Sequence, residues 1–372
     1  MKAQTHDFRD GNGPVPAHRH IKGGGWVADT ANVDKSAYIG PDAWVSGNAR
    51  VSGNARVYGN ARVYGNARVD NAWVSGDARV YGNARVSGNA RVSGDARASG
   101  DARVYGDARV HDNAWVYGNA RVSDNARVCG NALVYDNAWV YDNAWVYDNA
   151  WVYGNAWVYG NAWVYGSARV PGDARVSGDA RVYGSARVYG NARVYGNARV
   201  YGGARVSGDA RDSGDARVYG DARVNDNAWV YGNARVSDYA RVCGNALVYD
   251  NAWVYDNAWV YGNARVSGDA RASGDAWVYG NARVYDNARV HGDAWVYGNA
   301  RVMRGMYTST PTSITRSDGH MFTLQSDGSI VAGCRDFTPD EAKAHWGDPE
   351  HHKHRESMAI VTALNAIAAE RQ

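Results

Sequence analysis

The hexapeptide Val188-Tyr-Gly-Asn-Ala-Arg193 is followed at once by Val194-Tyr-Gly-Asn-Ala-Arg199, and variants of this unit run almost without interruption from Val27 to Val302. Its general form is Val, then Tyr or Ser, Gly or Asp, Asn or Asp, Ala, and finally Arg or Trp. A unit of six residues is too short to bury a core alone, so it must stack on copies of itself. The repeat therefore predicts a solenoid that grows lengthwise without a new core.

Within each unit the order Ala, Arg or Trp, Val alternates in the way that a strand does, with Val and Ala inward and Arg or Trp outward. Gly, Asn and Asp tolerate the left-handed backbone region, so they mark a corner after each strand. We expect an all-β triangular coil of three hexapeptides, with about 15 coils in a rod of roughly 70 Å. A flattened solenoid with two hexapeptides per coil is the alternative.

One early unit, Ile39-Gly-Pro-Asp-Ala-Trp44, has an aliphatic residue, Gly, two free positions, a small residue and another free position. It resembles the hexapeptide motif of left-handed parallel β-helix proteins, the transferase hexapeptide-like superfamily. That resemblance spans residues 26–302 and implies a left-handed coil, which is an exception to the usual right-handed crossover. Many members of that superfamily are acyltransferases or carbonic-anhydrase-like metalloenzymes, with histidines on a coil face and loops that form a cleft.

Two irregular units carry structural predictions. Val69 to Val74 spans five residues instead of six, so we expect a tightened corner there. Asp212 takes an inward position that Val normally holds, and an unpaired buried charge is costly. We therefore expect its strand to bulge or its carboxylate to find partners. A third feature, the recurrence of Ser93–Trp145 at Ser207–Trp259, 114 residues later, indicates a tandem duplication.

The composition changes on both sides of the repeat, which divides the chain into an N-terminal extension or cap (1–25), the β-helix (26–302) and an α+β C-terminal cap (303–372). In the cap we expect strands at Ser313–Arg316, Met321–Leu324 and Ser329–Ala332. Thr338-Pro-Asp-Glu341 has the sequence of a helix start. A second helix is expected from Arg355 to Arg371, with an apolar side made by Met358, Ile360, Val361, Leu364 and Ile367.

Short strings in this cap resemble the tails of phage and prophage hexapeptide proteins without an assigned activity. They are Asp318-Gly319, Ala332-Gly-Cys-Arg335, Phe337-Thr338, Glu341-Ala342 and His345-Trp346. The resemblance implies a phage or prophage origin, a bacterial host cell and, as one specific role, antagonism of a host defence protein.

Composition limits the function classes. The net charge of +3 does not demand a nucleic-acid or membrane partner. Three cysteines without paired spacing fit a reducing compartment. We find no signal-peptide core in the first 16 residues and no membrane span, so we expect a cytoplasmic protein, with virion association left open.

Catalytic and metal-binding residue types are sparse in the repeat. Its two histidines, His111 and His291, are 180 residues apart and cannot form a three-histidine zinc site. The run His351–His354 and a nucleophilic Cys334 are candidates in the cap, but a solvated run and a packing cysteine are the simpler interpretations. We therefore expect no enzyme activity, no cofactor and no metal site.

Dense tryptophan is the strongest binding signal. Trp residues stand at the outward position in neighbouring units, each followed by Tyr two residues later, and such surfaces often mark contact patches. The alternative is that aromatic residues simply suit strand exteriors. The candidate binding residues are Trp139, Trp145, Trp151, Trp157, Trp163, Trp253 and Trp259.

These observations together favour a non-enzymatic, rod-like binding protein. Its partner is expected to be a host protein, a virion component or another copy of the chain. A hexapeptide-type acyltransferase and a carbohydrate- or nucleic-acid-binding solenoid are the alternatives. The sequence leaves open the oligomeric state, and whether the repeat or the C-terminal cap recognises the partner.

Overall fold

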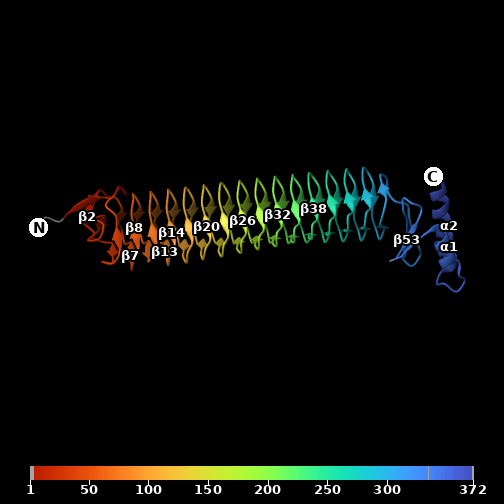
Figure 1. Cartoon of the computed structure of the whole chain (residues 1–372), viewed down its shortest axis with the longest axis horizontal. Helices are drawn as coiled ribbons and strands as arrows, with labels where there is room; N and C mark the ends of the chain where they lie inside the picture. Colours follow the sequence, from red (N-terminus) through yellow and green to blue (C-terminus); the bar gives the residue numbers. More distant parts are fainter. Residues whose placement is uncertain (1–3, 334, 371–372) are drawn as a thin grey trace. The chain divides into compact units, whose positions relative to one another are not determined.

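The computed structural model describes residues 4–333 and 335–370, and it is an all-β parallel β-solenoid of about 16 turns with two C-terminal helices (Figure 1). The chain forms two compact units, Met1–Gly196 and Asn197–Gln372, called unit 1 and unit 2 below. Every third strand belongs to the same sheet, so each coil has three faces. The three-sided coil is confirmed and the two-sided alternative is wrong, while the left-handed sense stays a prediction.

Unit 1 begins with a hairpin that the sequence did not predict. Strand β1 (Thr5–Asp7) pairs antiparallel with β2 (Pro14–Arg19), and β2 pairs antiparallel with β3 (Trp26–Ala28), the first strand of the solenoid. Phe8 from this hairpin packs with Ala17 and Ala28. The hairpin therefore covers a sheet edge that would otherwise expose unpaired backbone groups.

The remaining strands of unit 1 form three faces. The first face contains β3, β6 (Trp44–Val45), β9 (Arg62–Val63), β12 (Arg79–Val80), β15 (Arg97–Ala98), β18 (Trp115–Val116), β21 (Leu133–Val134), β24 (Trp151–Val152), β27 (Arg169–Val170) and β30 (Arg187–Val188). The second contains β4 (Asn32–Val33), β7 (Arg50–Ser52), β10 (Arg68–Asp70), β13 (Arg85–Ser87), β16 (Arg103–Val104), β19 (Arg121–Val122), β22 (Trp139–Val140), β25 (Trp157–Val158), β28 (Arg175–Val176) and β31 (Arg193–Val194). The third contains β5 (Tyr38–Ile39), β8 (Arg56–Val57), β11 (Trp73–Val74), β14 (Arg91–Val92), β17 (Arg109–Val110), β20 (Arg127–Val128), β23 (Trp145–Val146), β26 (Trp163–Val164) and β29 (Arg181–Val182).

Unit 2 has the same three faces. Its first face contains β33 (Arg205–Val206), β36 (Arg223–Val224), β39 (Arg241–Val242), β42 (Trp259–Val260), β45 (Trp277–Val278) and β48 (Trp295–Val296). The second contains β34 (Arg211–Asp212), β37 (Trp229–Val230), β40 (Leu247–Val248), β43 (Arg265–Val266), β46 (Arg283–Val284) and β49 (Arg301–Val302). The third contains β32 (Arg199–Val200), β35 (Arg217–Val218), β38 (Arg235–Val236), β41 (Trp253–Val254), β44 (Arg271–Ala272), β47 (Arg289–Val290) and β50 (Met306–Tyr307).

The core of each coil consists of the repeat Val and Ala, as predicted. Val188 and Ala192 are 0% exposed, and the same holds for nearly all their equivalents. Neighbouring coils pair in register, so that Val140 lies over Val158. Each Val therefore loses its apolar surface to the coils above and below it, which is the main stabilising contribution of a stacked repeat.

Corners contain the predicted left-handed residues. Gly130 has a φ of 66°, and Asp112 takes the equivalent position with a φ of 58°. The Asp residues gain an axial hydrogen bond, since Gly130 N donates to Asp112 Oδ2 at 3.2 Å. The next residue forms amide ladders: Asn119 Nδ2 donates to Asn137 Oδ1 at 3.1 Å, and Asn137 repeats this to Asn155 at 3.2 Å. These ladders link successive coils along the axis.

Of the predictions made for the two irregular units, the tightened corner is confirmed and the one for Asp212 is wrong. The five-residue unit does tighten a corner, with Asn71 alone in the left-handed region at a φ of 52°. At Asp212 the prediction is wrong: β34 stays regular, with Asp212 in register with Val230. Asp212 is 0% exposed, and both its carboxylate oxygens are without a hydrogen-bond partner in the described chain. Its neighbours are apolar because the column is built from Val, so no polar group is present to meet it.

The C-terminal cap belongs to unit 2. Four strands form an antiparallel sheet, β51 (Ser313–Thr315), β52 (Met321–Leu324), β53 (Ile330–Ala332) and β54 (Arg335–Phe337), against α1 (Pro339–Gly347) and α2 (His354–Glu370) (Figure 1). Strand β54 was not predicted. Thr338 forms the expected capping box with Glu341. The cap core includes the predicted Ile360, Val361 and Leu364, while Met358 and Ile367 are partly buried against it.

Gln325 joins this cap to the last coil of unit 2. Its side chain is 1% exposed. Its Oε1 accepts hydrogen bonds from Met303 N at 2.9 Å and from the Tyr307 hydroxyl at 2.8 Å. Its Nε2 donates to the Arg301 carbonyl at 2.9 Å. The side-chain amide of Gln325 therefore pairs with polar groups of the terminal coil, which has no next coil to pair with.

Among the described residues, no helix is long and apolar enough to cross a membrane.

Candidate functional site

The predicted tryptophans form stacks with arginine at both ends. On the second face of unit 1, the Trp139 and Trp157 ring centroids are 5.4 Å apart with their planes 8° from parallel. The Arg121 guanidinium lies 4.5 Å from the Trp139 ring, and the Arg175 guanidinium lies 4.9 Å from the Trp157 ring. Because outward positions of successive coils face each other, each ring face meets another ring or a cation.

The third face repeats this arrangement. Trp145 and Trp163 stack at 5.5 Å, and the guanidiniums of Arg127 and Arg181 lie 4.4 Å and 4.9 Å from them. On the first face Trp151 has no Trp neighbour, since it pairs with Leu133 on one side and with Arg169 on the other. The five predicted Trp of unit 1 are thus distributed over three faces, and only two pairs contact each other.

Tyrosine ladders run beside these stacks. Tyr141 and Tyr159 stack at 5.0 Å, and Tyr147 and Tyr165 stack at 4.8 Å. Partial burial, followed by the neighbouring Tyr, raises the pKa of Tyr141 to about 12. The Tyr141 phenol is therefore neutral near pH 7 and acts as flat, amphipathic surface.

All seven predicted Trp, including Trp253 and Trp259, stand at the outward position and are half-buried. Stacking explains this partial burial, because the coil spacing brings each ring face against the next coil and leaves mainly the ring edges to solvent. Trp253 follows the same pattern, with Arg235 and Arg271 each 5.8 Å from its ring. Whether these residues bind a partner stays a prediction.

A more exposed aromatic group lies on the first face of unit 2, and we call it the aromatic row. It contains three stacked Trp and three stacked Tyr from β42, β45 and β48 and the positions that follow them: Trp259, Trp277, Trp295, Tyr261, Tyr279 and Tyr297.

Within the aromatic row the Trp centroids are 5.2 and 5.5 Å apart and the Tyr centroids 5.0 and 5.5 Å apart. The Arg241 guanidinium covers one end, 4.5 Å from the Trp259 ring. At the other end Trp295 and Tyr297 are 47% and 46% exposed. The sequence analysis named only Trp259 of this group. The missing signal was the 18-residue coil period, which places Trp277 and Trp295 in the same column.

The histidine candidates are separated in the structure. His291 Nδ1 lies 2.9 Å from the Ser273 hydroxyl, and His354 Nδ1 lies 2.7 Å from the Trp346 carbonyl. In the run His351–His354 only His352 is mainly exposed, at 75%, while the other three residues are half-buried. Cys334 lies outside the described residues. His111, in contrast, lies beside Asp112 and close to Cys129 of the neighbouring coil, a group that the sequence analysis did not recognise.

Comparison with known proteins bears on the fold more than on the site. Among curated proteins, none matches the sequence. A crystal structure described as a "putative acetyltransferase from Desulfovibrio desulfuricans G20" is similar, with 12% identity over 84% of this chain and 77% of that chain and a TM-score of 0.22. That likeness is too low to carry an argument about activity.

A protein-family comparison covers more than half of the chain with the YdcK beta solenoid repeat. The matched residues are 43–59, 55–71, 61–77, 78–94, 84–100, 96–112, 102–118, 126–142, 144–160, 174–190, 186–202, 192–208, 216–232, 240–256, 258–274, 276–292 and 282–298. With three-faced coils, Val and Ala columns and matches throughout the repeat, the chain belongs to the YdcK beta solenoid repeat family.

Proposed function

We propose that this chain is a non-enzymatic binding protein and that a partner protein docks on the aromatic row of unit 2. The observation that carries the proposal is the exposure of Trp295 and Tyr297, 47% and 46%, at the end of a preformed stack. Trp and Tyr dominate the energetic centres of protein interfaces. Because the rings are already held by their neighbours, binding costs little side-chain entropy.

The stacking direction favours a protein over a sugar. Rings of the aromatic row stack face to face along the coil axis, with planes 5° and 15° from parallel between successive Trp. The faces between successive rings are therefore occupied and mainly ring edges point outward, so that a sugar could stack only on the outer face of Trp295 and not along the row. Edges and partly covered apolar surface suit the side chains of another protein.

Charge argues against nucleic acid as the partner. The guanidiniums of Arg241 and Arg235 lie over Trp rings instead of forming an open row. Asp and Asn at the corners dilute the positive field further, and the net charge is only +3. Nucleic-acid binding depends on several free cations that neutralise phosphates.

The regular coils support a non-enzymatic role over an acyltransferase. Strands recur every six residues from β11 to β49, which leaves no inserted segment to form the wall of a cleft. His291 bonds to a neighbouring Ser instead of facing a carboxylate. Acetyl-coenzyme A turnover by the purified full chain would contradict this part of the proposal.

The resemblance of the cap to phage and prophage hexapeptide proteins suggests where the partner is found. We propose a cytoplasmic protein of the bacterial host, with a host defence protein as one specific version. A virion component or a second copy of the chain is the competing occupant.

The test uses the full chain as bait in host lysate, followed by titration with the purified partner. Replacing both Trp295 and Tyr297 by Ala should weaken the partner at least tenfold, because the exposed rings are lost while the stack below them remains. Tyr239, 64% exposed at the corner that precedes β39 and outside the stacked rings, offers the matched control. Tyr239→Asn restores the usual repeat residue and should leave binding unchanged. Equal binding by wild-type chain and double variant, or dependence on Tyr239 alone, would contradict the proposal.

A further inference from the structure

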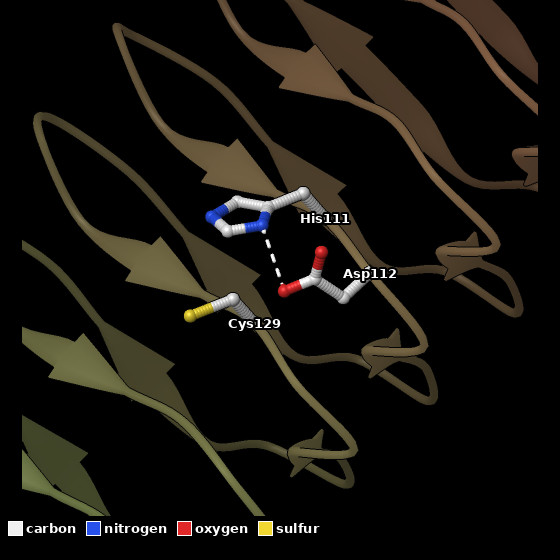
Figure 2. Close-up of side chains that lie close together, drawn as sticks. All are labelled: His111, Asp112 and Cys129. Carbon is white, nitrogen blue, oxygen red and sulfur yellow. Dashed lines mark ion pairs between the residues drawn. The ribbon is translucent and has the colours of Figure 1, made fainter.

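One group of metal-ligand types lies apart from the aromatic row, at a corner of the third face of unit 1. His111 and Asp112 follow β17, and Cys129 follows β20, the next strand of that face. Val110, which precedes His111, pairs with Val128, which precedes Cys129. His111 and Cys129 therefore hold the same position in neighbouring coils. Figure 2 shows the three side chains close together on two neighbouring coils, with the Cys129 sulfur turned away from the Asp112 carboxylate. Within residues 4–333 and 335–370, no other group of three His, Cys, Asp or Glu side chains has ligand atoms this close.

The distances are those of a site that needs only small adjustment. One ligand atom from each residue lies within 4.8 Å of the other two. His111 Nδ1 and Asp112 Oδ2 are 3.1 Å apart. Ligand bonds of about 2.0–2.3 Å in a tetrahedral zinc site put neighbouring ligand atoms roughly 3.3–3.6 Å apart. The nitrogen and oxygen are therefore already close to that spacing, and side-chain rotation of Cys129 closes the rest.

We infer that His111, Asp112 and Cys129 form a binding site for a borderline divalent cation of the Zn²⁺ class, with one coordination position open to solvent. Imidazole, carboxylate and thiolate are the zinc ligands of proteins, whereas Ca²⁺ and Mg²⁺ take oxygen alone. His111 and Asp112 side chains are 36% and 58% exposed, so the cation has an entry path and a free position. Because the ligands come from two coils, the ion would tie one coil to the next.

The backbone holds the central ligand in place. Asp112 has a φ of 58°, and its Oδ2 accepts a hydrogen bond from Gly130 N at 3.2 Å. That bond is the largest cause that lowers the pKa of Asp112, so the carboxylate is ionised before the ion arrives. Such outer contacts fix the orientation of ligands in metal sites.

Protons account for the binding step. The 3.1 Å between His111 Nδ1 and Asp112 Oδ2 would place the proton of a neutral imidazole on Nδ1 when no ion is bound. On binding, this imidazole proton moves to Nε2, and the Nδ1 lone pair goes to the ion. The Cys129 thiol loses its proton to solvent, and the sulfur lone pair forms the third bond. One proton is released in total near neutral pH, so affinity should fall as pH is lowered.

The same three residue types occur in thiol nucleophile triads, but the surroundings here favour the metal. Burial is the main cause that raises the pKa of Cys129 to about 11, and the carboxylates of Asp112 and Asp148 add to it. A reactive thiolate needs the opposite, a lowered pKa in a positive environment. A cation supplies that positive charge and stabilises the thiolate directly.

The chain contains its own matched comparison. In the duplicated segment 114 residues later, Asn225, Asp226 and Cys243 replace His111, Asp112 and Cys129. The corner is otherwise alike, since Gly244 N donates to Asp226 Oδ2 at 3.0 Å, and Cys243 is also half-buried. The second corner thus has carboxylate and thiol without imidazole. It should bind the ion at least tenfold more weakly.

Cobalt titration of the full chain tests the inference, with Cys334→Ser to remove the cap thiol. Thiolate ligation of Co²⁺ gives a charge-transfer absorption that histidine sites in the cap cannot produce. We expect one equivalent of thiolate-bound Co²⁺, displaced by Zn²⁺. His111→Asn, which copies the second corner, should raise the dissociation constant at least tenfold, and Cys129→Ser should remove the tight thiolate band and leave only the weaker binding of the Cys243 corner.

The gain-of-site variant keeps the test independent of any folding defect. Asn225→His should create a second thiolate-bound Co²⁺ with Cys243, while Cys243→Ser in the parent should leave the first site unchanged. Absence of the band in the parent, an unchanged band in His111→Asn, or no second equivalent in Asn225→His would each overturn the inference. Far-ultraviolet circular dichroism confirms that each variant retains the strand signal.

Discussion

Asp212 pairs in register with Val230 and occupies a Val position inside the coil, fully buried and without a hydrogen-bond partner among the described residues. Burial alone raises its pKa to about 8. The carboxyl group is therefore mostly protonated at pH 7, which removes the charge but leaves an unsatisfied polar group in an apolar column. This position is a local weak point of unit 2.

The first prediction concerns the pH dependence of stability. An unfolded Asp has a pKa of about 3.9, below the folded value. Between these two values the unfolded chain is ionised while the folded chain still holds the proton, so the free energy of unfolding falls by about 1.4 kcal/mol per pH unit as pH rises. Below pH ~4 both states hold the proton, and the titration of Asp212 costs no stability. By pH 7 the loss in the free energy of unfolding reaches about 4 kcal/mol, and it levels off above the folded pKa.

Asp212→Val should remove this slope and stabilise unit 2 near neutral pH, because it restores the repeat residue. Asp212→Asn keeps a polar group that does not titrate. The difference in the free energy of unfolding between Asp212→Asn and Asp212→Val should therefore not change with pH. Urea unfolding of the three proteins between pH 5 and 9 measures the effect. If the free energy of unfolding changed with pH in the same way for the parent and for Asp212→Val, Asp212 would be ionised or solvated in the folded chain.

The second prediction concerns the Trp stacks. Trp157 lies between Trp139 and the Arg175 guanidinium. Trp157→Ala should destabilise the chain by about 1–2 kcal/mol, since it removes one aromatic stack and one cation–π contact. Circular dichroism during urea unfolding is the appropriate measurement because it does not depend on tryptophan fluorescence.

Trp157→Arg is the matched control, as Arg is the other common outward residue of the repeat. Its guanidinium can stack on Trp139, so the loss should stay below ~1 kcal/mol. If Ala and Arg at this position had equal effects, the Trp stacks would contribute nothing beyond side-chain size.

The third prediction concerns the junction of the last coil with the cap. Gln325→Leu has nearly the same volume but leaves Met303 N, the Arg301 carbonyl and the Tyr307 hydroxyl without their partner. Each orphaned buried polar group costs about 1–3 kcal/mol, so we expect a total loss of roughly 3 kcal/mol or more. Hydrogen exchange should show loss of protection at the last coil and in β52, with earlier coils unchanged.

Gln325→Glu separates shape from hydrogen bonding, because its carboxylate keeps the acceptor for Met303 N and loses the donor to Arg301. An intermediate effect is expected. Unchanged exchange protection in Gln325→Leu would mean that the terminal coil is closed by other contacts.

Strict periodicity explains why the sequence predicted so much of the solenoid. Val188 and Ala192 are buried because strand alternation places both side chains on the inner side of the coil. Gly130 and Asp112 turn corners because their backbones accept a positive φ. The count of about 15 coils fell short of about 16 because Met306–Tyr307 forms a last strand without the repeat sequence.

The features that the sequence did not reveal depend on contacts between neighbouring coils. Trp295 was missed and the half-burial of Trp139 was not foreseen, since ring burial follows from residues 18 positions away and not from neighbours in sequence. The proximity of His111 and Cys129 follows from the same 18-residue step, but a search among histidines alone overlooked it. The isolation of Asp212 is a property of its column, which one strand cannot show.

The central claim is that partner binding uses the outward aromatic row. Hydroxyl-radical footprinting of the full chain, free and in complex with its purified partner, tests this most directly because Trp and Tyr side chains report their own exposure. The account predicts strong protection of Trp295 and Tyr297 in the complex and unchanged oxidation of Tyr239. Protection confined to the C-terminal cap, or to Tyr239, with Trp295 oxidised as in the free chain, would contradict it.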